Sequence, residues 1–284
     1  MRVLLSSSPA ALTAALAAFA STATVEAEFG DVTVPGSVLT FAHHGKNAGN
    51  PCPCSYPNTV ADGLGVEAVG ISHVDLDTLG GVLAIQGRKP EAPSFWALAE
   101  FMDLNGAHRL SQSGASAEDV ARLHAWWAWS EANRLYAPRD GSVTDAGAWI
   151  DAAAEAVKSI LEGDPALLQA GEAFRLAGEA LNSASFVEAS KGVLLRSSDA
   201  FTNHLYTSPS GEVGKAVVAF STKFRSVTVS FEAGSASPVS AREFVQSLWG
   251  DLAGGHHGIA GSPRETQMTL EDARSAAEAL RKLL

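Results

Sequence analysis

The sequence predicts an α/β protein in which a mostly parallel sheet flanked by helices precedes a smaller α+β C-terminal domain. Two observations predict this fold class. Through residue 190, short β-prone apolar runs alternate with helical segments, which is the pattern of strand–helix–strand units. From Lys191 onward the chain changes to closely spaced strands separated by turn residues. We therefore place one domain at residues 1–190 and a second at residues 191–284.

The first domain is expected to open with a strand at 2–6 and a helix at 9–21, for which Ser8 is the N-cap and Pro9 the first helical residue. The next elements expected are a strand at 24–29, an apolar β-prone segment at 32–41, a loop at 46–62, a strand at 66–71 and a helix to residue 85. Helices are expected at 94–101 and 116–136, and the stretch at 148–188 is expected to be helical with a division at Gly163-Asp164-Pro165.

In the second domain, turn residues separate four apolar or alternating segments. We expect strands at 192–196, 204–207, 215–221 and 226–232, then a helix at 238–249, a glycine-rich loop at 250–262 and a last helix capped by Thr269.

The composition describes a globular protein and limits its partners. With 46% hydrophobic and 18% charged residues, 284 residues can bury a large core. The net charge of −11 argues against long nucleic acid or an anionic membrane as the partner, because both are bound by clustered Lys and Arg. No stretch reaches the roughly 20 apolar residues that span a membrane. We expect a cytoplasmic protein, and a homodimer stays open.

Two features allow a second interpretation. The apolar segment from Leu4 to Ala20 could be a cleaved secretion signal, but Ser6-Ser7-Ser8-Pro9 interrupts it and favours a strand followed by a helix. The two cysteines, Cys52 and Cys54, are too close in sequence for an unstrained disulfide. Reduced thiols are therefore expected, with a soft-metal site as the less favoured alternative.

A motif after the apolar strand at 66–71 carries the strongest chemical signal. His73, Asp75 and Asp77 alternate along the expected carboxyl end of that strand, so a period of two would point all three side chains the same way. Ligands bind at this edge of an open α/β sheet. Oxygen and nitrogen donors crowded there suit a Mn, Mg, Fe or Zn ion. The alternative is that the acids cap the following helix.

The histidines also favour a site. Of the eight, all but His124 lie in expected loops or at the ends of elements, and most stand beside Gly, Asp or Asn. They are His43, His44, His73, His108, His124, His204, His256 and His257.

A second constellation lies in the C-terminal loop, Gly254-Gly255-His256-His257-Gly258-Ile259-Ala260-Gly261, which is followed by Arg264. Its glycines let backbone N–H groups approach an anion, and the Arg264 guanidinium fits a phosphate or carboxylate. His204 and Arg225 are further candidate donors, although a position on the ordinary surface is the favoured explanation for each.

These residues support a named resemblance. Phe224-Arg225-Ser226-Val227, the helix at 241–249 and the loop Gly254–Gly261 resemble the C-terminal domain that accompanies DHH phosphoesterases. Ile71-Ser72-His73-Val74-Asp75-Leu76-Asp77 resembles the first metal motif of that superfamily, a strand ending in His-x-Asp-x-Asp. Ala42-His43-His44 has Ala where the Asp-His-His triplet has its acid, and it lies upstream of the first motif.

These departures imply a rearranged N-terminal half. In that arrangement Glu26 or Glu28 stands near the family's second acid, and Asp103 with His108 is the alternative replacement. The first motif also begins about seventy residues into the chain, whereas the family usually opens with it.

The resemblance implies a hydrolase that holds two Mn²⁺ or Mg²⁺ ions and cleaves a small, nucleotide-like phosphoester with metal-activated water. The implied catalytic and metal-binding residues are His73, Asp75, Asp77 and Asp103, with His43 and His44 as further metal ligands. The implied substrate-binding residues are Gly254, Gly255, His256, His257, Arg264, Arg225 and His204, with the substrate between the two domains.

Two other functions stay open. A nucleotide-binding or regulatory module without catalysis is favoured by the missing acid before His43. A metal-dependent hydrolase of an amide or ester would use the same ligands, because they also activate water for attack on a carbonyl.

Overall fold

The computed structural model describes residues 1–29, 32–44, 47, 49–232, 235 and 237–284. The chain divides into two compact units, which are described separately. The N-terminal unit comprises residues 1–104 and 113–174, and the C-terminal unit comprises residues 105–112 and 175–284. The expected boundary was residue 190. The break between the units instead lies at 174/175, inside one continuous helix, α6 (Pro165–Ser185).

The N-terminal unit is built on a five-stranded sheet in the order β5 (Leu39–Phe41), β2 (Thr22–Val25), β6 (Ala68–Ile71), β1 (Arg2–Leu5) and β7 (Thr144–Asp145). The first four strands are parallel, and only β7 runs antiparallel to β1. This confirms the expected α/β class with a mostly parallel sheet. The strands β1, β2 and β6 are almost wholly buried, as expected of a sheet covered on both faces.

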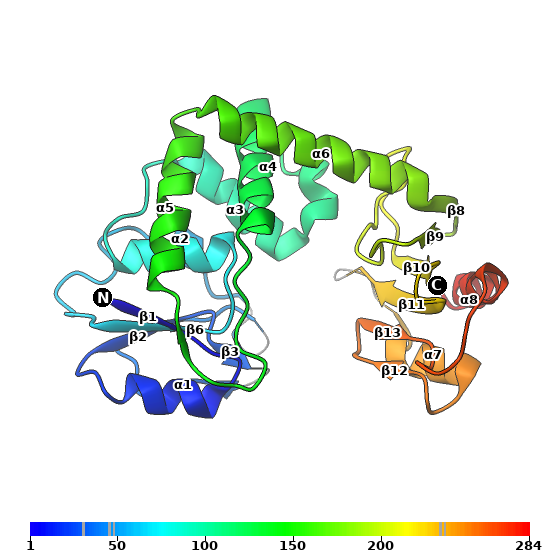
Figure 1. Ribbon diagram of the computed structural model, residues 1–284, viewed down its shortest axis with the longest axis horizontal. Coiled ribbons are helices and arrows are strands. Elements are labelled where there is room, and N and C mark those ends of the chain that lie inside the picture. Colours follow the sequence, from blue (N-terminus) through cyan, green and yellow to red (C-terminus); the bar gives the residue numbers. More distant parts are fainter. Residues whose placement is uncertain (30–31, 45–46, 48, 233–234, 236) are drawn as a thin grey trace. The chain divides into compact units, whose positions relative to one another are not determined.

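Helices cover both faces of this sheet (Figure 1). Helix α1 (Pro9–Leu16) packs on β1 and β6 from one side; Ser8 caps it as expected, but it ends five residues early. On the other side α2 (Leu76–Ile85) packs on β2, and α5 (Gly147–Leu161) packs on β1. The unit also contains β3 (Glu28–Phe29) and β4 (Val32–Thr33), which pair as a hairpin, and the short helix η2 (Pro53–Ser55).

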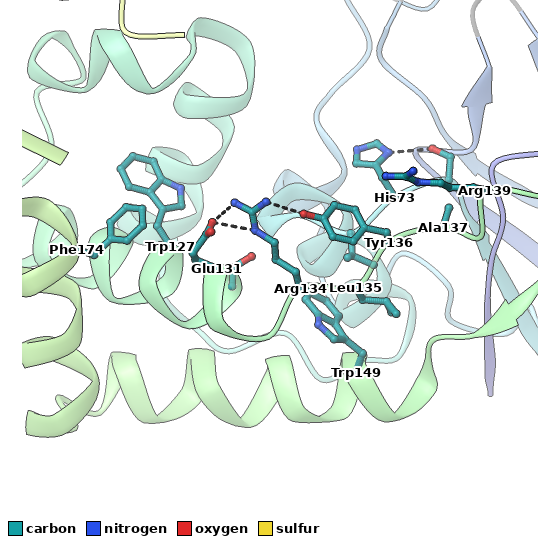
Figure 2. A pocket seen from close by; sticks show the side chains of 13 residues that line it. His73, Trp127, Glu131, Arg134, Leu135, Tyr136, Ala137, Arg139, Trp149 and Phe174 are labelled. Carbon is teal, nitrogen blue, oxygen red and sulfur yellow. Dashed lines mark hydrogen bonds and ion pairs between the residues drawn. The ribbon is translucent and has the colours of Figure 1, made fainter. Parts of the chain in front are cut away.

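Two more helices complete the unit, α3 (Pro93–Asn105) and α4 (Ala117–Ala132). Helix α4 begins at the expected N-cap, Ser116, packs on α5 and carries three tryptophans. Trp126 is buried, whereas Trp127 and Trp149 are half-buried and line a pocket at the end of α4 (Figure 2).

The C-terminal unit is a mixed six-stranded sheet in the order β12 (Gly254–Gly255), β13 (Ile259–Gly261), β11 (Ser226–Phe231), β10 (Ala216–Ser221), β9 (Val193–Ser198) and β8 (Phe186–Ser190). Helices α7 (Ala241–Trp249) and α8 (Leu270–Leu283) pack on it through a core that includes Val218, Phe244 and Leu280. Capping boxes start both helices, at Ser240 and Thr269.

Two expectations for this unit were wrong. Residues 204–207 do not form a strand, because the carbonyls of Leu205 and Thr207 accept hydrogen bonds from the buried Arg196 guanidinium, at 2.7 Å each. The glycine-rich stretch at 250–262 is not a simple loop either. It contains the β12–β13 hairpin, which extends the sheet along β11.

Segment η3 (Ala107–Gln112) lies within the first half of the sequence but belongs to the C-terminal unit. His108 and Arg109 both contact the Glu232 carboxylate, at 3.1 Å and 2.7 Å, and the carbonyl of His108 accepts a hydrogen bond from Thr207. These contacts explain why the chain crosses from one unit to the other before α6.

Candidate metal centre

The carboxyl ends of three neighbouring parallel strands position the candidate site. Glu26 follows β2 directly, His43 lies two residues after β5, and His73 lies two residues after β6. Because β5, β2 and β6 are adjacent in the sheet, these side chains meet at one edge. This is the edge at which the sequence placed the site.

Glu26 is the centre of this group. Its carboxylate is fully buried and lies 2.6 Å from Nε2 of His43, 3.5 Å from Nε2 of His44 and 3.1 Å from Nε2 of His73. The Glu26 backbone has a φ of 51°, in the left-handed region that non-glycine residues rarely adopt. Such strain is concentrated at functional sites.

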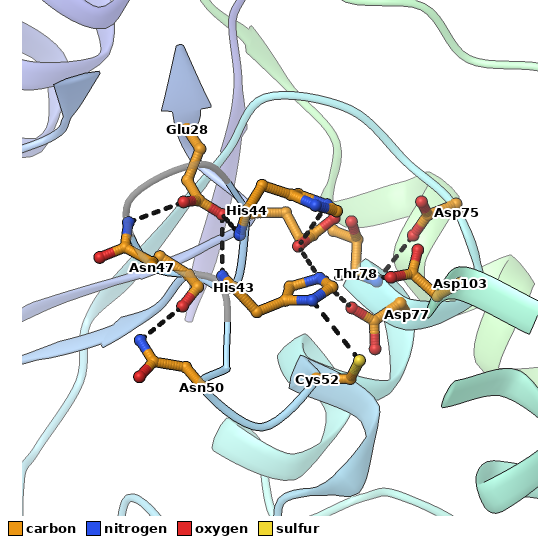
Figure 3. Close-up of polar contacts among 12 residues, drawn as sticks. Glu28, His43, His44, Asn47, Asn50, Cys52, Asp75, Asp77, Thr78 and Asp103 are labelled. Carbon is orange, nitrogen blue, oxygen red and sulfur yellow. Dashed lines mark hydrogen bonds and ion pairs between the residues drawn. The ribbon is translucent and has the colours of Figure 1, made fainter. Parts of the chain in front are cut away.

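Two further acids approach His43 from elements that are distant in sequence. Asp77, in the first turn of α2, and Asp103, near the end of α3, lie 3.3 Å and 3.4 Å from Nε2 of His43 (Figure 3). Nε2 of His43, one carboxylate oxygen of each of these two acids and both oxygens of Glu26 are buried without a hydrogen-bond partner in the described part of the chain. Buried polar atoms left in this way are costly unless a ligand satisfies them.

Neighbouring loops hold the site in place. Glu28 accepts hydrogen bonds from the backbone N–H groups of His43 and His44, at 2.9 Å and 3.1 Å. Asp77 accepts one from the N–H of Cys54 at 2.8 Å, which ties η2 to α2 (Figure 3 shows the surrounding contacts). Of the two acids that the sequence offered as the second acid, Glu26 lies in the group and Glu28 supports its backbone.

The thiol of Cys52 also reaches the group. Its Sγ lies 3.5 Å from Nδ1 of His43 (Figure 3). The sequence left this residue without a role, since one cysteine in a proline-rich loop shows no spacing to a distant histidine. Cys52 and Cys54 are both buried as free thiols, and burial raises the pKa of each.

The group could hold a metal ion. Three overlapping sets of side chains have ligand atoms within 4.8 Å of one another: Glu26, His43, His44 and Asp103; His43, Cys52, Asp77 and Asp103; and Glu26, His73 and Asp75. All six residues that the sequence named as metal ligands belong to these sets. The sets also contain Glu26, one of the two acids that the sequence offered as the second acid, and Cys52.

His73, Asp75 and Asp77 converge by a different route from the one expected. Strand β6 ends at Ile71, so His73 and Asp75 lie in the connecting loop and Asp77 in a helix, and strand alternation does not apply. Asp75 is the N-cap of α2 and accepts from the Thr78 N–H at 2.8 Å, while its other oxygen lies 3.1 Å from Nε2 of His73. It therefore has the capping role of the alternative interpretation and also a place in the cluster.

The close carboxylates and imidazoles shift one another's pKa. Burial raises the pKa of Glu26, but contact with His43 and His73 outweighs it and brings the pKa to about 2. Burial, followed by repulsion from Asp77, Asp75 and Glu26, raises the pKa of Asp103 to about 6. Burial lowers the pKa of His73, but Asp75 and Glu26 outweigh it and raise the pKa to about 10.

The pKa of His43 is raised furthest, by its contacts with Asp77, Cys52 and Glu26. The cluster therefore stabilises positive charge at both imidazoles, which is the electrostatic environment that a bound cation needs.

The residues predicted to bind substrate all lie in the C-terminal unit. His256 and His257 are exposed at the tip of the β12–β13 hairpin, where the N–H of His256 donates to the Ile259 carbonyl at 2.7 Å. Gly254 and Gly255 form β12 and are exposed. Arg225, Arg264 and His204 are exposed on neighbouring loops.

The sequence also offered His108 as a partner of Asp103 in the metal site. His108 instead contacts the Glu232 carboxylate of the C-terminal unit and does not belong to the cluster around Asp103.

A small hollow of about 220 Å³ lies beside the predicted substrate-binding residues of the C-terminal unit. Phe201, Asn203, Phe224 and Thr228 are among its lining residues, and Oδ1 of the buried Asn203 has no hydrogen-bond partner within the described residues.

No protein-family model matches the chain, and no curated protein matches its sequence. The resemblance to DHH phosphoesterases therefore stays a prediction. None of the helices in the described residues is long and apolar enough to cross a membrane.

Proposed function

We propose that this protein is a metal-dependent phosphohydrolase that cleaves a small, nucleotide-like phosphoester. One observation carries the proposal. Acids and imidazoles from three strand ends and two helices converge at the carboxyl edge of the sheet, and several of their polar atoms are buried without hydrogen bonds. The donors are carboxylate oxygens and imidazole nitrogens, which suit Mn²⁺ and tolerate Mg²⁺.

The overlap of the three ligand sets supports two divalent cations, with Glu26, His43 and Asp103 shared between sets. When bound, such cations lower the pKa of water and offset the negative charge of a phosphate group. Asp77 and Asp103 would hold cations on the buried side of the group. His73 and Asp75, whose side chains are 46% and 40% exposed, would face the incoming substrate.

The C-terminal unit would supply anion-binding groups. Arg264 and Arg225 are exposed guanidinium groups on the loops next to β11, and His256 lies at the hairpin tip. Exposed Arg side chains can bind a phosphate with two parallel hydrogen bonds.

The test is a substrate screen with the full chain in Mn²⁺. The panel contains nucleotides, generic phosphodiesters, and an ester and an amide of similar size. We expect phosphoester hydrolysis that EDTA abolishes and that Asp77→Asn strongly reduces, because a cation ligand is lost. The Asn side chain keeps the oxygen that accepts from Cys54, so the fold is preserved.

Asp145→Asn is the matched control, since Asp145 is a half-exposed acid of the same unit that pairs with Arg2. Hydrolysis of the ester or amide alone would contradict phosphoester specificity. Metal binding without hydrolysis of any compound would favour the non-catalytic module.

A further inference from the structure

A pocket of about 690 Å³ opens beside the metal-binding cluster on the N-terminal unit. Its wall combines the end of α4 and the segment that follows it with Ser72, His73 and Val74, and Trp149 and Phe174 complete it. His73 belongs both to this wall and to the ligand set of Glu26, His73 and Asp75. The volume lies in the range of pockets that enclose a small organic ligand.

Aromatic rings form much of the wall, and their neighbours fix their positions. The buried Trp126 contacts Trp149 edge-on at 6.3 Å between ring centroids. The indole N–H of Trp149 donates to the Asn133 carbonyl at 2.6 Å. Trp127 meets His124 edge-on at 5.1 Å. Rings held in this way can stack on a planar group with little loss of side-chain entropy.

The two arginines of the pocket differ in whether their charge is paired with an acid. Arg134 is neutralised by Glu131 and donates to the Tyr136 hydroxyl at 2.6 Å, so it mainly orders that side chain. Arg139 is exposed and has no ion-pair partner among the residues described. In the view of Figure 2, Arg139 lies with His73 at one end of the pocket, and Trp127 lies with Phe174 at the other. The pocket therefore has an aromatic end and a cationic end.

We propose that this pocket binds the planar base of a nucleotide, with the base at the aromatic end, against Trp127, and the phosphate directed toward Arg139 and His73. Aromatic stacking accepts every base, because each presents a flat π-face. The proposal that a base binds here is argued from the pocket alone. Only the statement that the bound phosphate is then cleaved rests on the proposed function.

The test measures binding in the absence of metal, so it does not depend on catalysis. The protein is stripped with EDTA and titrated with AMP and with ribose 5-phosphate, which share the sugar and phosphate and differ only in the base. We expect AMP to bind at least about tenfold more tightly, as stacking of one base provides. In saturation-transfer NMR, the adenine H2 and H8 protons should receive more saturation than the ribose protons.

Trp127→Leu should remove the preference for AMP while leaving the weak binding of ribose 5-phosphate unchanged. Trp129→Leu is the matched control, because Trp129 is a half-buried tryptophan on the same helix that is not among the pocket-lining residues. Circular dichroism of both variants checks that the helix is intact. The AMP titration of Phe174→Leu, which alters the ring beside Trp127 (Figure 2), gives a second measurement if Trp127→Leu does not fold.

Equal affinity for AMP and ribose 5-phosphate, or unchanged AMP binding in Trp127→Leu and Phe174→Leu, would overturn the proposal. A preference for AMP in a protein that hydrolyses no phosphoester would uphold the pocket and reject the phosphohydrolase. Phosphoester hydrolysis without a preference for AMP over ribose 5-phosphate would uphold the phosphohydrolase and reject the base-binding pocket.

Discussion

Nε2 of His43 lies 2.6 Å from Oε1 of Glu26, and both side chains are buried. Neither atom has a hydrogen-bond partner of acceptable geometry in the described residues, although the distance is that of an ion pair. Asp77 and Asp103 lie around this pair, and these ligand-type atoms fall into overlapping sets that could hold a metal ion.

Metal binding should release protons from the two central histidines. The pKa of His73 is raised to about 10 and that of His43 is raised further, so both rings carry a proton at pH 8 that a metal must displace. Titration calorimetry of Mn²⁺ into EDTA-treated protein, repeated in buffers of different ionisation enthalpy, should show release of about two protons. With unshifted histidines the release would be close to zero at this pH, and that result would reject the cluster.

Asp103→Asn should weaken metal binding and stabilise the metal-free protein. The folded-state pKa of Asp103 is about 6, above its ordinary value of 3.8, so the folded protein binds the proton more tightly than the unfolded chain does. The ionised group therefore costs folding free energy above pH 6, and the cost disappears as the pH falls from 6 toward 3.8.

Urea unfolding at pH 8 should show a gain on the order of 1 to 3 kcal/mol for Asp103→Asn, with a smaller gain at pH 5. Mn²⁺ affinity of the unmodified protein should fall as the pH drops through 6, since protonated Asp103 is a poor ligand. A variant that loses stability equally at both pH values would assign Asp103 a structural role.

Cys52→Ala should lower metal affinity without removing a ligand. The thiol contacts Nδ1 of His43 at 3.5 Å and leaves Nε2 facing the carboxylates, so it orients the ring. Loss of such an orienting partner lowers metal affinity about 10- to 100-fold. Burial raises the Cys52 pKa, which keeps the thiol protonated. The Co²⁺-loaded protein should therefore lack a thiolate-to-cobalt charge-transfer band, and a strong band that disappears in Cys52→Ala would make Cys52 a direct ligand.

The sequence predicted the edge of the sheet at which the site lies, and the reasons are local. Apolar strands are followed by His and Asp residues at 43, 73 and 75, and parallel pairing brings such strand ends together. The sequence could not order the strands, because pairing of β2 between β5 and β6 depends on long-range packing. Glu26 was for this reason only one of two candidate acids. Its left-handed backbone has no signature in the surrounding residues.

Other parts of the site depend on tertiary contacts that no periodicity encodes. Asp103 joins the cluster because α3 continues to Asn105, four residues beyond the expected end at 101. Cys52 joins because Asp77 binds the N–H of Cys54 and draws the loop onto α2. That approach requires Gly80, where an added Cβ would lie 2.5 Å from the Cβ and 2.8 Å from the Cα of Cys54.

Gly80→Ala should therefore destabilise the protein and the cluster together. The backbone of Cys54 would have to shift, and overpacking of this kind costs about 1 to 3 kcal/mol. Urea unfolding measures the loss. Gly178→Ala is the control, because Gly178 lies in α6 with no atom within 4 Å of the added Cβ, and alanine there should stabilise by up to about 1 kcal/mol. Equal stability of Gly80→Ala and the parent protein would contradict the packing of η2 on α2.

The most direct test of the metal centre is to count bound Mn²⁺ by electron paramagnetic resonance. EDTA-treated protein is titrated with Mn²⁺, and the free-ion signal is compared for the parent chain, Glu26→Gln, Asp77→Asn and the surface control Asp145→Asn. The cluster predicts at least one equivalent bound by the parent chain and by Asp145→Asn, and a loss of about 10-fold or more in affinity for the other two. Equal Mn²⁺ binding by all four proteins, or no binding by the parent chain, would contradict it.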